Sequence, residues 1–221
     1  MDAIVKARIT QVCVMTSRAE QPDMKQRILE TADRLFYLHG IRAVGVDTVA
    51  AEIGISKRTL YNHFPSKDEL IKAYLARRSV TMPPSDKAPI EQILGTFDSL
   101  ERRFGAKDFR GCPFVNAVTE LGAEDHAVRK IATAFKDGRR ARFHDLLKRL
   151  GAANAERLAT QLQLLVDGAI AADLVHNDPS MAVAAKQAAR VLLRNAGVEV
   201  GDCLSTSSPR KRGPTRRGGA V

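Results

Sequence analysis

The stretch that most limits how this chain can fold is a Gly-Ile-Ser turn, Gly54 to Ser56. A short apolar helical pattern lies on each side of this turn. Gly54 stands where the first helix must end in a left-handed backbone conformation, which a residue without a Cβ adopts cheaply. Ser56 follows at the position of an N-cap, whose hydroxyl accepts a free amide of the next helix. Apolar residues recur at helical spacing across both segments, at Val46, Val49, Ala50, Ile53, Ile55, Leu60 and Phe64. We therefore expect two short helices that share one core.

The second of these helices is rich in polar side chains. In a helix-turn-helix unit, the start of the second helix lies in the major groove of DNA and the first helix crosses the backbone. The candidate readers of base edges are Lys57, Arg58, Thr59 and Asn62. Arg binds guanine and Asn binds adenine through paired hydrogen bonds, each worth about 1 to 3 kcal/mol of discrimination, whereas Lys57 also suits a phosphate. Tyr61, His63 and Lys67 suit phosphate oxygens. The alternative is a solvated polar face on a small helical hairpin.

The flanking segments supply the rest of a small helical domain. Upstream, residues 25–40 carry an apolar stripe at helical spacing, and Gly40 stands at the C-terminal stop. Downstream, Pro65 ends the second helix, and Ser66 is placed to cap another helix. Asp68 and Glu69 fall in the first turn of that helix, where the helix dipole favours anions. Lys67 is thereby expected at a helix start that faces the DNA backbone.

Between residues 25 and 75 the chain resembles the TetR family of bacterial transcriptional regulators. The matching segments are ILETADRLFYLHG, VAAEIGIS, KRTLYNHF and PSKDELI. The resemblance implies an all-α fold: an N-terminal three-helix DNA-binding domain with a helix-turn-helix, and a larger C-terminal helical domain that binds a ligand and dimerises. It also implies that the seven residues named above contact an operator, with Thr48 as a weaker candidate on the preceding helix. Val44 and Gly45 depart from the Thr or Ser of many members, so we leave them out of the binding set.

The resemblance and the composition together predict four parts of the chain. Residues 1–23 form an N-terminal extension, 24–70 the DNA-binding domain, 71–200 the effector-binding and dimerisation domain, and 201–221 a basic disordered tail. The linking helix should end at residues 82–85, where Pro83 and Pro84 remove backbone donors. Further helices are expected near residues 90–104, 126–150, 155–176 and 179–195.

Residues 111–117 resemble a segment of one branch of the TetR family, in which a loop turns into a helix beside the effector cavity. On that resemblance Cys112, Phe114 and Asn116 lie near a pocket for a small-molecule effector. The alternative is that Phe114 belongs to the ordinary core and that Asn116 is a surface amide.

The last two expected helices are rich in small residues that permit close helix approach, namely Ala169, Ala171, Ala172, Ala182, Ala184, Ala185, Ala188 and Ala189. The family resemblance implies that two such helices from each chain form a four-helix interface in a homodimer. The alternative is packing within one chain. A homodimer would read a pseudo-palindromic double-stranded operator, and effector binding would release it by favouring a conformation that no longer matches the operator spacing.

The net charge and the cysteine content of the chain limit the classes of function that it can have. The net charge is +10, but Arg210, Lys211, Arg212, Arg216 and Arg217 of the tail supply half of it, so the DNA argument rests on placed residues. Cys13, Cys112 and Cys203 stand far apart without metal-ligand spacing, so we expect no metal, cofactor or disulfide framework. The N-terminus has no continuous apolar segment, and we expect a cytoplasmic protein with no membrane partner.

Three other functions compete with this interpretation. A redox-sensing regulator would use Cys112 as a reactive thiol beside Arg110, which requires an accessible thiol of lowered pKa. A helical enzyme would pair Cys112 with His126 or His144, but no catalytic triad, phosphate loop or paired carboxylate motif accompanies them. A helical scaffold without DNA binding leaves the polar face from Lys57 to Lys67 unexplained.

Overall fold

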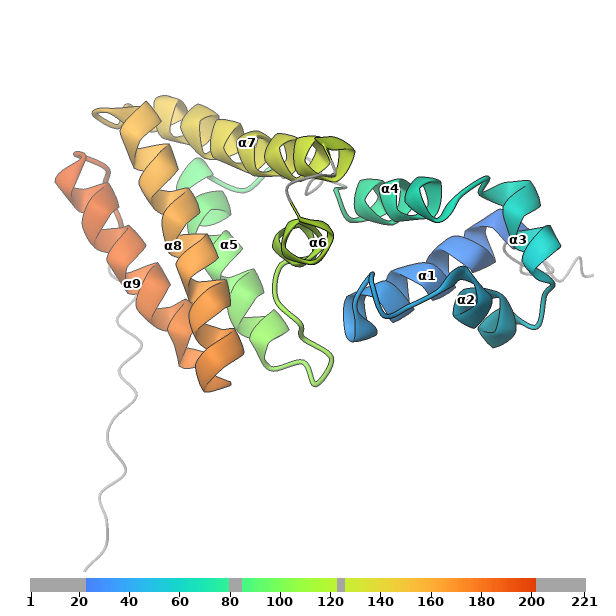
Figure 1. The fold of residues 1–221 in the computed structure, drawn as a ribbon. Coiled ribbons are helices and arrows are strands. Elements are labelled where there is room, and N and C mark those ends of the chain that lie inside the picture. Colours follow the sequence, from blue (N-terminus) through green and yellow to red (C-terminus); the bar gives the residue numbers. More distant parts are fainter. Residues whose placement is uncertain (1–22, 80–84, 123–125, 202–221) are drawn as a thin grey trace, which may run out of the picture. The chain divides into compact units, whose positions relative to one another are not determined.

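The computed structural model describes residues 23–79, 85–122 and 126–201. Over these residues it contains nine α-helices and no strand (Figure 1), which confirms the all-α prediction. The chain divides into two compact units. Of the described residues, unit 1 contains 23–79, 113–122 and 126–131, and unit 2 contains 85–112 and 132–201. Helix α7 (His126–Arg149) therefore contributes its first turns to unit 1 and the rest to unit 2.

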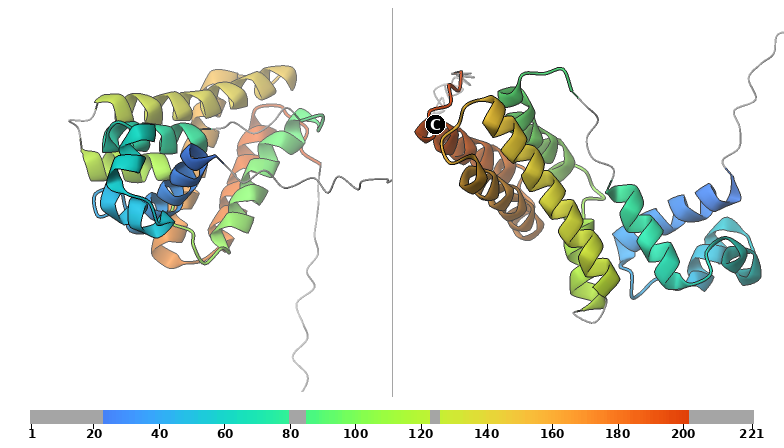
Figure 2. Two further views of the ribbon diagram at one scale, coloured as in Figure 1. Left: turned by 90° about the vertical axis from the view of Figure 1, so that its right-hand side faces the viewer. Right: turned by 90° about the horizontal axis from the view of Figure 1, so that it is seen from above.

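Unit 1 contains the helices α1 (Met24–His39), α2 (Val46–Ile53), α3 (Lys57–His63), α4 (Lys67–Arg78) and α6 (Pro113–Leu121). Helix α1 packs against α2 and α4, and α2 packs against α3. The apolar stripe predicted for residues 25–40 is the buried face of α1, with Ile28, Ala32, Leu35 and Phe36 in the core. Helices α3 and α4 add further residues to this core, among them Leu60, Leu70 and Tyr74. Figure 2 shows the unit from two further sides.

Unit 2 contains α5 (Pro89–Phe104), most of α7, α8 (Ala155–His176) and α9 (Ser180–Asn195). Helix α9 packs along both α8 and α5. Four of the predicted small residues, Ala169, Ala182, Ala185 and Ala189, are buried within the chain, so they serve the intrachain packing that was the alternative to a dimer interface. Ala171 and Ala184 are exposed. The alanine-rich pattern therefore covers two different faces.

The expected helices agree closely with the observed ones. Helix α8 has the predicted bounds, and α9 begins one residue after Pro179, which serves as its N-cap. The boundaries of the four predicted parts stay a prediction, because compactness divides the chain differently and groups α6 with α1 to α4. The extension up to residue 22, the break at residues 82–84 and the tail from residue 202 lie outside the described residues.

Helix α8 is long and apolar enough to cross a membrane by length and composition. It nevertheless packs against α9 and α5, and it buries Leu158, Leu162, Val166 and Ile170 in unit 2. These contacts place one face of the helix in the core of unit 2.

Candidate nucleic-acid interface

The turn between α2 and α3 is built as its sequence predicts. Gly54 has a φ of 77° and its amide donates to the carbonyl oxygens of Ala50 and Ala51, which ends α2. Ser56 caps α3, because its side chain accepts a hydrogen bond from the amide of Thr59 at 3.0 Å. Leu60 is fully buried and fixes the helix on the core of unit 1. Local chemistry therefore sets the direction in which α3 presents its polar side chains.

Helix α3 has one buried and one open face. Leu60 on the helix and Phe64 just after it are buried. The predicted DNA contacts on the exposed surface are Thr48, Lys57, Arg58, Tyr61 and Asn62, and the half-buried ones are Thr59, His63 and Lys67. Val44, excluded from the predicted set, belongs to the core. The surface around α3 thus combines hydrogen-bond donors, acceptors and positive charge, as a reader of base edges and phosphates requires.

Lys57 and Thr59 have partners that sequence reasoning missed. The ammonium of Lys57 donates to the Asp47 carboxylate on α2 at 3.0 Å, and this hydrogen bond raises the pKa of Lys57. The hydroxyl of Thr59 lies 2.9 Å from the hydroxyl of Ser56. Asp47 stands ten positions before Lys57, which matches no helical spacing. Only the angle between α2 and α3 brings the two side chains together.

Two further lysines lie near the C-terminal end of α3. Lys67 opens α4, whose N-cap Ser66 accepts a hydrogen bond from the amide of Glu69 at 3.1 Å. Burial lowers the pKa of Lys67, and the charges of Asp68 and Glu120 oppose that shift. Lys25, which was not among the predicted contacts, places its ammonium 5.7 Å from the centre of the Phe64 ring. Nothing in the sequence around Lys25, at the start of α1, indicates that this residue lies near Phe64.

The last turn of α4 is fixed to α1 by a network around Arg78. The guanidinium donates two hydrogen bonds to the Asp33 carboxylate, at 2.7 and 2.8 Å. It also lies over the ring of Tyr37, 4.2 Å from its centre, and near the ring of Tyr74. A planar guanidinium suits this paired and stacked geometry better than a lysine ammonium does. Helices α1 and α4 are therefore held at a fixed angle within unit 1.

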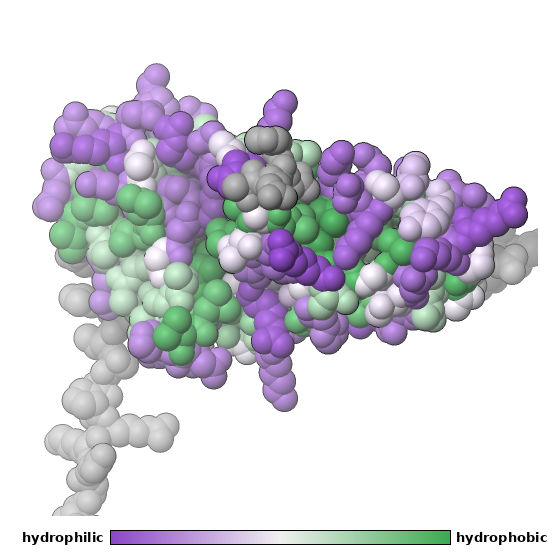
Figure 3. Space-filling model, in the orientation of Figure 1, coloured by the Kyte–Doolittle hydropathy of each residue, from purple (hydrophilic) through white to green (hydrophobic). Residues whose placement is uncertain are grey.

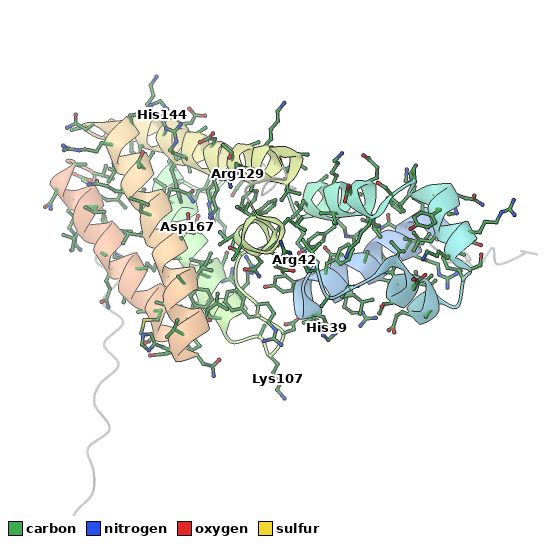
Figure 4. All side chains as sticks on the ribbon, viewed as in Figure 1. His39, Arg42, Lys107, Arg129, His144 and Asp167 are labelled. Carbon is green, nitrogen blue, oxygen red and sulfur yellow. The ribbon has the colours of Figure 1, made fainter. Side chains whose placement is uncertain are left out.

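Helix α6 contacts the turn that follows α1. The Glu120 carboxylate accepts a hydrogen bond from the amide of Arg42 at 3.0 Å. Arg42 is labelled in Figure 4. The same carboxylate fills the space beside Gly40, where a Cβ would meet its oxygen at 2.9 Å. Gly40 has a φ of 92°, so both backbone conformation and space favour glycine there.

The structure distributes the three predicted ligand residues over both units. Cys112 is buried in unit 2, whereas Phe114 is buried and Asn116 half-buried on α6 in unit 1. A pocket of about 240 Å³ lies between the start of α8 and the end of α9 and includes Asn154, Arg157 and Asn195, but none of the three. Their role as effector contacts stays a prediction. Within the described residues, no group of three or more His, Cys, Asp or Glu side chains is arranged to hold a metal ion.

Comparisons with known proteins agree with this architecture. Residues 28–74 match the family described as "Bacterial regulatory proteins, tetR family". Residues 89–187 match the "Transcriptional regulator LmrA/YxaF-like, C-terminal domain". An uncharacterised helix-turn-helix regulator of Bacillus subtilis, YxaF, is 27% identical over 197 residues, which are 83% of this chain and all of the relative.

Solved structures match both the helix-turn-helix segment and most of the helical segment that follows it. A TetR-type transcriptional regulator from Streptomyces avermitilis is 34% identical, has a TM-score of 0.71, and covers 79% of this chain and 98% of its own. A transcriptional regulator from Saccharomonospora viridis in complex with choline is 22% identical, with a TM-score of 0.60 over 79% and 97%. The sequence, the helix-turn-helix geometry and the helical fold therefore all match the same protein family. The chain belongs to the TetR family of bacterial transcriptional regulators.

Proposed function

We propose that this DNA-binding regulator recognises a pseudo-palindromic operator as a homodimer and is released from it by a small molecule. The observation that best supports this proposal is the exposed polar face of α3. The apolar side of this helix is buried, whereas its charged and amide side chains remain exposed. A recognition helix of seven residues contacts few bases. Two copies about one helical turn apart roughly combine their binding energies.

An exposed apolar face on unit 2 supports the homodimer. The side chains of Leu164 and Val175 on α8 are 64% and 80% exposed, and Val191 on α9 is 53% exposed. Figure 3 shows hydrophobic residues gathered over α8 and α9. Exposed apolar patches of this kind mark interaction sites in soluble proteins. We place the partner subunit here, along with the exposed Ala171 and Ala184.

Repression with release by an effector is the mode that we propose for regulation. A protein of the same fold holds choline, so this fold can accommodate a small organic molecule. The redox alternative is not favoured, because Cys112 is only 7% exposed and a sensing thiol must be accessible. As a TetR regulator the chain is not an enzyme. We expect it in the cytoplasm, where its DNA is.

Selection of bound fragments from random duplex DNA tests the proposal. We expect an enriched sequence with two inverted half-sites whose centres lie about 10 base pairs apart, or a multiple of that spacing. Deoxyribonuclease footprinting on the enriched duplex should protect both halves. Enrichment of a single asymmetric site, or none at low ionic strength, would contradict it.

A further inference from the structure

Unit 2 contains a half-buried polar cluster between α7 and α8, formed by Lys136, Arg139, Gln163 and Asp167. Arg139 donates from Nε to the Gln163 oxygen at 2.8 Å and from Nη2 to Asp167 Oδ1 at 2.9 Å. Lys136 donates to the same Oδ1 at 2.5 Å. The Gln163 amide donates to the other oxygen, Oδ2, at 2.8 Å. Asp167, labelled in Figure 4, lies on α8.

The cluster has more positive than negative charge. Two cations share the one carboxylate of Asp167, which leaves a net charge of +1. The side chains of Lys136 and Arg139 are only 22% and 19% exposed, so water screens this charge weakly. Half-buried charges are costly without a partner of opposite sign. An additional anion would therefore be bound more favourably here than at an exposed lysine.

Arg139 has a donor left for such an anion. Its Nε and Nη2 are engaged, and among the described residues no hydrogen bond is found from Nη1. The Phe135 ring lies beside the guanidinium, 5.4 Å from its carbon to the ring centre. Burial lowers the pKa of Arg139, Arg103 adds to this effect, and Asp167 and Cys112 oppose it. Cys112, one of the predicted effector residues, is thus an electrostatic neighbour of the cluster.

We propose that the effector is a small organic anion whose carboxylate binds Arg139 and Lys136 and whose planar apolar part packs beside Phe135. This inference rests on the proposed function, in which an effector releases the protein from DNA. Asp167 competes with the ligand for both cations. Removing its charge should therefore strengthen ligand binding, whereas removing the Arg139 charge should abolish it.

Three probes of one shape and different charge test the inference. Benzoate, benzamide and benzylamine are titrated into the full chain by calorimetry at constant ionic strength. We expect benzoate to bind at least tenfold more tightly than either of the others. Equal binding of benzoate and benzamide, or preference for benzylamine, would overturn the inference.

Variants of the cluster residues test whether the polar cluster between α7 and α8 causes the preference for benzoate. In Arg139→Met the preference for benzoate should disappear, and in Asp167→Asn the affinity for benzoate should rise severalfold. Loss of folding alone would lower binding in both, so the opposite directions are diagnostic. Arg140→Met is the matched control, because Arg140 is the next residue on α7 and pairs with Glu156 instead. Unchanged benzoate binding in Arg139→Met would contradict the assignment.

Operator binding separates this inference from the proposed function. Wild type and all three variants should bind the selected operator without a probe, and benzoate should release wild type and Asp167→Asn but not Arg139→Met. If the protein binds an operator and shows no preference for benzoate, the anion site is wrong and the DNA function stands. If no operator is found, the proposed function fails whatever the titrations show.

Discussion

Arg58 and Lys67 are predicted to make two different kinds of DNA contact. Arg58 is exposed on α3, where a guanidinium can bind a guanine edge, whereas Lys67 lies at the start of α4. Arg58→Ala should weaken binding by about 1 to 3 kcal/mol at one base position and relax specificity there. Lys67→Ala should weaken binding to all sequences and reduce the salt dependence. Fluorescence anisotropy on operator and single-base variants over a salt series measures both. Equal effects of the two changes would contradict these roles.

Asp47 limits the freedom of Lys57. Because the carboxylate lies 3.0 Å from the lysine ammonium, it competes with a nearby phosphate for this charge. In Asp47→Asn we expect tighter binding to non-specific DNA and a salt dependence steeper by about 0.9 in log–log slope, as one more phosphate contact would give. The double variant Asp47→Asn with Lys57→Ala should lose this increase. A slope unaffected by Asp47→Asn would show that Lys57 is already free.

At the scale of a single element, we expect Asp173 near the end of α8 to make the free energy of unfolding depend on pH. Its side chain is 3% exposed, and Oδ1 has no hydrogen-bond partner among the described residues. Burial raises the pKa of Asp173 above its ordinary 3.8, although the amide of Asp178 opposes the shift. The folded state therefore binds this proton more tightly than the unfolded state, and the free energy of unfolding falls as pH rises above 3.8 through the raised pKa.

Asp173→Asn should remove the fall in the free energy of unfolding that accompanies ionisation of the Asp173 carboxyl group. At pH 7 we expect the variant to be more stable than wild type by about 1 kcal/mol, since a neutral amide replaces a buried charge. The difference should shrink toward pH 4. Urea unfolding at several pH values measures it. A wild type that equals or exceeds the variant at pH 7 would show that the carboxylate is stabilised by a partner.

The local turns and helix caps of unit 1 were predictable from the sequence, whereas contacts between helices were not. Gly54, Ser56 and Ser66 have their predicted roles, because turns and caps depend on neighbours within a few residues. Gly40 was predicted as a helix stop only. Its second role, space for the carboxylate of Glu120, depends on a residue 80 positions away. The Asp47–Lys57 and Arg139–Asp167 pairs were missed for the same reason, since helix packing and not spacing brings them together.

At the scale of the whole molecule, Gly168 tests the proposed dimer. This exposed glycine of α8 lies one turn after Leu164, and a Cβ there would meet nothing within 4 Å. Gly168→Arg should leave the helical fold intact and place a charge in the proposed interface, which would shift the protein to monomers. Gly138→Arg is the matched control, because Gly138 is equally open and exposed on α7. Sedimentation velocity distinguishes the outcomes, and a dimer that persists in Gly168→Arg would place the interface elsewhere.

The most direct test of the account is whether the open face of α3 distinguishes one DNA sequence from another. Anisotropy titrations compare the selected operator with a shuffled duplex, using wild type and the double variant Arg58→Ala with Asn62→Ala. Wild type should prefer the operator by at least about a thousandfold at physiological salt. The double variant should keep its helical circular dichroism and bind both duplexes with similar, weak affinity. An operator preference that survives in the double variant would contradict the assignment of α3 as the recognition helix.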